Sequence, residues 1–105
     1  MAAKLLLSAL LLSAFALAGC SGSTTDTIEI HESSFHPSTL TVSAGEEVHV
    51  ENHDSFAHTL TADGGAFNTG NIASGGDAHI VAPAKGTYAF HCAIHSSMKG
   101  TLTVK

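Results

Sequence analysis

The sequence predicts an all-β fold, a Greek-key β-sandwich of seven or eight short strands. Apolar and polar residues alternate in short windows over residues 27–105, and no window repeats with the period of a helix. Glycine-rich turns such as Gly64-Gly65 and Gly75-Gly76 separate these windows. At 105 residues the chain has room for one such domain.

Each predicted strand points every second residue toward the core, because side chains alternate across a strand. The residues expected to face inward are, in chain order, Ile28, Ile30, Leu40, Val42, Val48, Val50, Tyr88, Phe90, Cys92, Leu102 and Val104. Turns are expected at residues 44–46 and 83–86, where glycine or proline interrupts the alternation. The stretch 66–76 is irregular, and we assign it no chemistry.

The N-terminal segment is predicted to direct export. Lys4 precedes an apolar run over residues 5–18, which is shorter than the about 20 residues of a membrane-spanning helix. We therefore predict a signal peptide over residues 1–19, a polar tether over residues 20–26 and a single domain over residues 27–105.

Cys20 closes the apolar run in the sequence Leu17-Ala18-Gly19-Cys20. This ending resembles the lipoprotein box of bacteria, in which the cysteine is lipidated and becomes the mature N-terminus. The alternatives are an ordinary thiol and a disulfide with Cys92, since an exported chain with two cysteines invites that pairing. Lipidation is the prediction, and it implies an extracytoplasmic protein anchored to a bacterial membrane.

A second pattern, Cys92-x-x-His95-x-x-Met98, follows the last aromatic strand, and His58 lies upstream. A thiolate, two imidazoles and a thioether form a ligand set soft enough for copper, and Cys/His/His with a weak axial Met is typical of electron-transfer copper. Structural zinc sites use four Cys or His ligands and not Met. The pairs of cysteines that haem attachment or thioredoxin chemistry require are absent. The alternative is a buried free cysteine beside incidental histidines.

The chain also resembles the cupredoxins, the blue-copper family, over essentially all of residues 27–105. The residues that carry the resemblance are 35–46, 52–61 and 86–104. The resemblance implies one copper ion held by His58, Cys92, His95 and Met98, with electrons leaving through the edge of His95. It also places Thr59 where plastocyanin has an asparagine that ties the ligand loops together, and the threonine hydroxyl is expected to take that role.

Six further histidines lie outside this ligand set. His49 and His53 are too far apart along one strand to share an ion, at about 3.3 Å per residue. His31 and His49 could be neighbours on adjacent strands and bind a second metal ion. We instead expect these histidines to lie on a solvated face, because no carboxylate or cysteine completes a ligand set with them. His91 is expected to point away from the metal, and His36 to have no partner.

The net charge is −5 at pH 7, and the predicted signal peptide contains one of only four basic residues. Such an acidic chain argues against nucleic acid as a partner.

We expect a membrane-tethered blue-copper protein that passes single electrons between redox partner proteins. The rival is a lipoprotein that captures, buffers or delivers copper without a redox role. An enzyme is not expected, because copper oxidases and nitrite reductases resembling this fold need additional histidines and more than one such domain.

Overall fold

The computed structural model describes residues 26–105, which form eight strands and confirm the all-β prediction. The strands are β1 (Asp26–His31), β2 (Ser34–His36), β3 (Thr39–Val42), β4 (Glu47–Asn52), β5 (Thr61–Ala62), β6 (Asp77–Val81), β7 (Gly86–His91) and β8 (Lys99–Val104). In this part of the chain no helix is long and apolar enough to cross a membrane. The predicted signal peptide and Cys20 lie outside the described residues.

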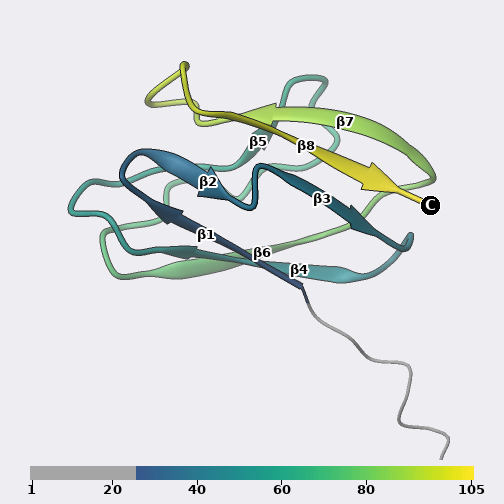
Figure 1. Cartoon of the computed structure of the whole chain (residues 1–105), viewed down its shortest axis with the longest axis horizontal. Helices are drawn as coiled ribbons and strands as arrows, with labels where there is room; N and C mark the ends of the chain where they lie inside the picture. Colours follow the sequence, from purple (N-terminus) through teal and green to yellow (C-terminus); the bar gives the residue numbers. More distant parts are fainter. Residues whose placement is uncertain (1–25) are drawn as a thin grey trace, which may run out of the picture.

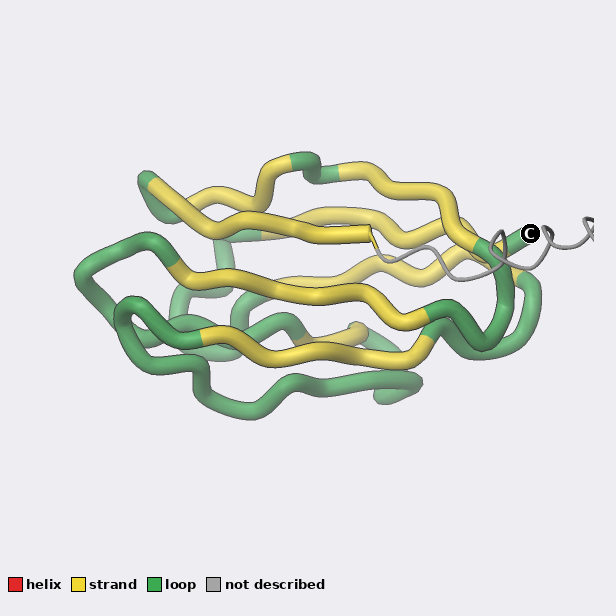
Figure 2. Tube along the Cα trace, turned by 90° about the horizontal axis from the view of Figure 1, so that it is seen from below, coloured by secondary structure: helices red, strands yellow, loops and turns green. Residues whose placement is uncertain are grey.

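The strands form two sheets that face each other as the layers of a sandwich (Figure 1). The first sheet has the order β2-β1-β4-β6, and the second has the order β3-β8-β7-β5. Each sheet contains one parallel pair, β1 with β4 and β3 with β8, and its other pairs are antiparallel. Strands form both layers and loops connect them at the ends (Figure 2). The strand β1 begins one residue before the predicted start of the domain, because Asp26 already pairs with Val48.

The core lies between the two sheets. Its buried members are Ile28, Ile30, Phe35, Val42, Val48, Val50, Leu60, Ala62, Phe67, Ile72, Ile80, Ala82, Phe90, Cys92, Met98, Leu102 and Val104, with Leu40 and Tyr88 packed against them. Every residue predicted to face inward belongs to this group, since alternation in a strand buries one face. The irregular stretch 66–76 also contributes, through Phe67 and Ile72.

Gly100 allows the second sheet to close over the core. It lies opposite Phe90 in the pairing of β7 with β8. A Cβ atom at Gly100 would overlap Cζ of Phe90 and would lie 2.7 Å from the carbonyl oxygen of Ser38. The aromatic ring therefore fills the space that any other side chain at position 100 would need.

The turn between β1 and β2 has a conformation that its residues rarely adopt. Glu32 and Ser33 both have φ of 55°, the left-handed region that favours glycine or asparagine. Their backbone N–H groups donate to the two carboxylate oxygens of Asp54, at 2.7 and 2.9 Å. Asp54 belongs to the loop after β4, so this carboxylate ties the turn to that loop.

Candidate metal centre

His58 is delivered by the loop that follows β4, and Asn52 shapes that loop. Asn52 is buried, and its side-chain amide donates to the carbonyl oxygens of Phe56 and Ile72 at 2.8 and 2.9 Å. Its side-chain oxygen accepts the backbone N–H of Asp54 at 2.9 Å. A buried amide with both ends satisfied fixes the surrounding backbone, because breaking either end would leave a polar group without a partner.

Asp54 orients the imidazole of His58. Its Oδ2 atom lies 2.8 Å from Nε2 of His58, which is fully buried. Burial alone would raise the pKa of Asp54, but hydrogen bonds from Ser33, His58 and Glu32 outweigh it and lower that pKa. An ionised carboxylate only accepts hydrogen bonds, so Nε2 of His58 donates to Asp54, and Nδ1 is left to face the interior.

Cys92 and His95 lie on the loop between β7 and β8. The loop is closed by two backbone hydrogen bonds, from Cys92 N–H to the carbonyl of Met98 at 3.1 Å and from Met98 N–H to the carbonyl of His95 at 2.9 Å. Cys92 and Met98 are both buried, and Cys92 is a free thiol. The strand alternation that buries Phe90 carries on to Cys92 and directs the sulfur inward.

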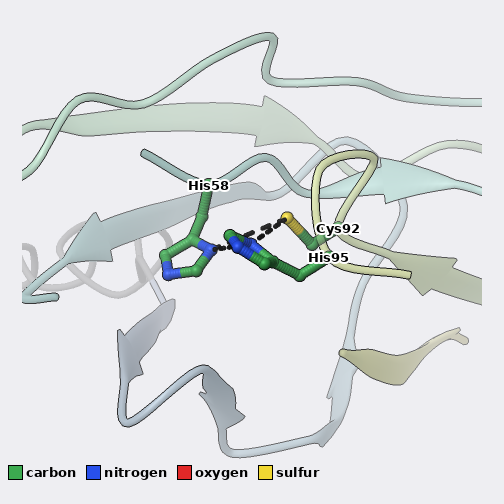
Figure 3. Close-up of side chains that lie close together, drawn as sticks. All are labelled: His58, Cys92 and His95. Atoms are coloured by element: carbon green, nitrogen blue, oxygen red, sulfur yellow. Dashed lines mark hydrogen bonds between the residues drawn. The ribbon is translucent and has the colours of Figure 1, made fainter. Parts of the chain in front are cut away.

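Three donor atoms converge where these two loops meet (Figure 3). The sulfur of Cys92 lies 3.7 Å from Nδ1 of His58 and 4.0 Å from Nδ1 of His95, and the two nitrogens are 3.2 Å apart. Nitrogen and sulfur donors bind a metal at about 2.0 and 2.3 Å, which places donors spread around one ion roughly 3.5 Å apart. The three donors therefore fit a single ion, and a thiolate with two imidazoles suits copper.

The environment of Cys92 favours its thiolate, the form that binds metals. Burial opposes ionisation, but hydrogen bonds from the backbone N–H groups of Thr59, His95 and Ile94 outweigh it and lower the pKa of the Cys92 thiol to about 6. The N–H of Thr59 lies 3.3 Å from the sulfur. The charge and the positions of the donors thus suit a cation.

Thr59 connects the two ligand loops, as expected from the resemblance. The backbone N–H of Ala93 donates to the Thr59 hydroxyl at 2.8 Å. The hydroxyl of Thr61 donates to Asn68 at 3.1 Å, so the 2.9 Å contact between the two hydroxyls is a donation from Thr59 to Thr61. Thr59 follows the metal ligand His58 in the chain, and Ala93 follows the metal ligand Cys92. The hydrogen bond between Thr59 and Ala93 therefore holds the two ligand loops together.

Of the residues predicted for the site, His58, Cys92 and His95 meet around one point, and Met98 is buried on the same loop as two of them. Asp54 and Asn52 are site residues that sequence reasoning missed. The spacing of four residues between Asp54 and His58 was the available signal, since the two side chains meet across one turn of the loop.

The remaining histidines differ in part from expectation. His91 points away from the centre and bonds to Asp63 at 2.6 Å, as expected. The less favoured alternative, in which His31 neighbours His49 across strands, is wrong, because the parallel register of β1 and β4 places Thr27 opposite His49. His36 was expected to have no partner, but its ring stacks on that of His31 at 3.8 Å.

Known proteins of similar sequence and structure support this interpretation of the centre. The cupredoxin-like domain family matches residues 3–104. Plastocyanin A/B of Petroselinum crispum is 32% identical over 83 residues, which cover 67% of this chain and 86% of that protein. An oxidised point mutant of amicyanin superposes with a TM-score of 0.71 at 19% identity, covering 76% of this chain and 81% of that one.

A copper-containing nitrite reductase from Thermus scotoductus SA-01 also superposes, with a TM-score of 0.71 at 25% identity. The match covers 78% of this chain but 22% of the enzyme. The family match spans nearly the whole chain, and the strand order and the donor geometry agree with it. The chain belongs to the cupredoxin-like domain family.

Proposed function

We propose that this protein binds one copper ion and transfers single electrons between redox partner proteins. The observation that carries the proposal is the convergence of a buried cysteine sulfur and two imidazole nitrogens within 4.8 Å of one another. His58, Cys92 and His95 would hold the ion, and Met98, buried on the same loop as two of them, would add a weak thioether donor. Plastocyanin as a relative and amicyanin as a structural neighbour support this assignment.

The chain contributes a fixed set of donors and a dry environment. When bound, copper supplies the chemistry, which is a change of one charge between Cu(II) and Cu(I). The Asp54 carboxylate accepts a hydrogen bond from Nε2 of His58 and so fixes that imidazole. The Thr59 hydroxyl holds the two ligand loops together. Because these contacts are made within the protein, they would hold the donors in place in either oxidation state of a bound copper ion.

The exposed surface beside the centre suits a docking protein. His95 is partly exposed, whereas His58 is buried. Phe56 and Ile94 lie on the two ligand loops and expose 64% and 47% of their surface. An apolar surface around the one accessible ligand would bring a partner's redox centre near His95 while excluding water. We assign electron entry and exit to this surface.

Export and lipid anchoring at Cys20 belong to the same proposal. The apolar run over residues 5–18 and the small residues before Cys20 support it. Two or more acyl chains give stable anchoring where one is marginal. Mass spectrometry of the N-terminal peptide of the native protein tests this, and an unmodified peptide that begins after Cys20 would contradict it.

The second candidate is capture and delivery of copper, which the many histidines outside the centre favour. Repeated reduction and reoxidation at an electrode, with copper measured after each cycle, separates the two functions. An electron carrier keeps one copper per chain, whereas a delivery protein releases it to a chelator on reduction.

We propose no enzyme activity, since this chain corresponds to less than a quarter of the nitrite reductase it matches.

A further inference from the structure

The outer face of the first sheet carries an unusual concentration of metal-binding side chains. Five of the eight histidines lie on or beside its strands, outside the copper centre: His31, His36, His49, His53 and His79. Along β4 and just beyond it, glutamate and histidine alternate on this face, because every second side chain points outward. The sequence of this outward row is Glu47, His49, Glu51 and His53.

Carboxylates on neighbouring strands lie directly opposite one another in this face. Glu51 of β4 pairs with Glu29 of β1 on one side and with Asp77 of β6 on the other. Like charges at opposite positions destabilise a sheet. No lysine or arginine stands on any strand of this sheet within the described residues. The row is therefore a concentration of negative charge without a permanent cation on the sheet to offset it.

One part of this face already has the geometry of a metal site. A carboxylate oxygen from Glu29, another from Glu51 and a ring nitrogen of His53 all lie within 4.8 Å of one another. Nε2 of His53 is 3.1 Å from Oε1 of Glu51. The backbone N–H of His53 donates to the carbonyl of Ile30 at 2.8 Å, which fixes this residue beside β1 and next to Glu29.

We propose that Glu29, Glu51 and His53 form a second metal site that binds a divalent transition-metal ion. Carboxylates with an imidazole are the oxygen and nitrogen donors that Cu(II), Ni(II) and Zn(II) accept, and Cu(II) binds such sets most tightly among these metals. The set has no sulfur donor, so it does not stabilise Cu(I) as the buried centre does. Binding here is open to solvent and leaves the thiolate centre undisturbed.

A neighbouring group on the same face provides the internal comparison. His49 and His79 lie directly opposite each other on β4 and β6, and each Nε2 atom lies 3.4 Å from a different oxygen of Glu47. Their ring centroids are 6.1 Å apart. The carboxylate separates the two imidazoles, so this group must rearrange before both rings reach one ion. We therefore assign the site to Glu29, Glu51 and His53.

The test uses the untagged protein already loaded with one equivalent of copper, so that the buried centre is occupied. A second equivalent of Cu(II) is added and followed by electron paramagnetic resonance and by the visible thiolate band. Zn(II) is titrated into the same copper-loaded protein by calorimetry. The variants are His53→Gln with Glu51→Gln, His49→Gln with His79→Gln, and the control His91→Gln, whose ring bonds to Asp63 away from this face.

The proposal predicts a second copper signal with nitrogen and oxygen ligands and an unchanged visible band. The variant at Glu51 and His53 should lose at least about tenfold in affinity for both ions, and the His91 control should match the parent protein. Two results would overturn it. One is equal affinity in the parent and in the variant at Glu51 and His53. The other is loss of binding only in the variant at His49 and His79. Thermal unfolding of each metal-free variant shows that the fold is intact.

Discussion

Thr59→Val tests whether the hydroxyl of Thr59 holds the two ligand loops together. The substitution keeps the shape of a buried side chain and removes the acceptor for the backbone N–H of Ala93, at 2.8 Å. A buried donor left without a partner costs about 1–3 kcal/mol. The N–H of Ala93 is only partly buried, so we expect the free energy of unfolding to fall by about 1–2 kcal/mol.

The measurement is urea unfolding of the metal-free protein, supported by thermal unfolding. In a domain of this size, about 1 kcal/mol corresponds to roughly 4–8 °C, so the midpoint should fall by roughly 5–15 °C. Thr61→Val is the matched control, because the Thr61 hydroxyl bonds to Thr59 and Asn68 but to no backbone N–H. We expect the control to change stability by about 0.5 kcal/mol or less. Equal losses in the two variants would refute the assigned role of Thr59.

Three further predictions concern the centre and the sheet beneath it. Asp54→Asn should lower stability and raise the reduction potential, because a carboxylate beside the His58 ring favours the more highly charged Cu(II); voltammetry showing an unchanged potential would contradict this. Gly100→Ala should destabilise the domain by about 2–3 kcal/mol, since its Cβ meets the Phe90 ring, and urea unfolding equal to that of the parent would show that the ring moves freely. The thiolate absorbance of metal-free Cys92 should titrate with a midpoint near pH 6, and a midpoint near 9.0 would contradict the hydrogen-bond argument. Because the folded pKa is the lower one, this group's stabilisation is fully present above pH 9.0 and is lost as the pH falls through about 6.

The fold was largely predictable because its strands follow simple alternation. Val48 and Val50 are buried and Glu47, His49 and Glu51 lie outside, as the sequence pattern requires. The alternation of residues in one strand does not predict which residues of a neighbouring strand lie opposite it. The weak pairing of His31 with His49 was wrong because β1 runs parallel to β4, which shifts the facing residues along the strand. That same register places Glu29 opposite Glu51, and these two carboxylates lie beside His53.

The ligand residues were predictable from local spacing, whereas the residues that position them were not. Cys92, His95 and Met98 lie within one loop, and their spacing is visible in the sequence. Asp54 acts through contacts to His58 and to a turn more than twenty residues upstream, which no short pattern contains. Thr59 was anticipated only through the family resemblance.

The most direct test of the proposed copper centre is the visible spectrum of the protein loaded with one equivalent of Cu(II). A bond from the Cys92 thiolate to copper predicts an intense charge-transfer band that a reductant bleaches and reoxidation restores. The band should be absent in Cys92→Ser. A Cu(II)-loaded parent protein without this band, or a Cys92→Ser variant that keeps it, would contradict the assignment.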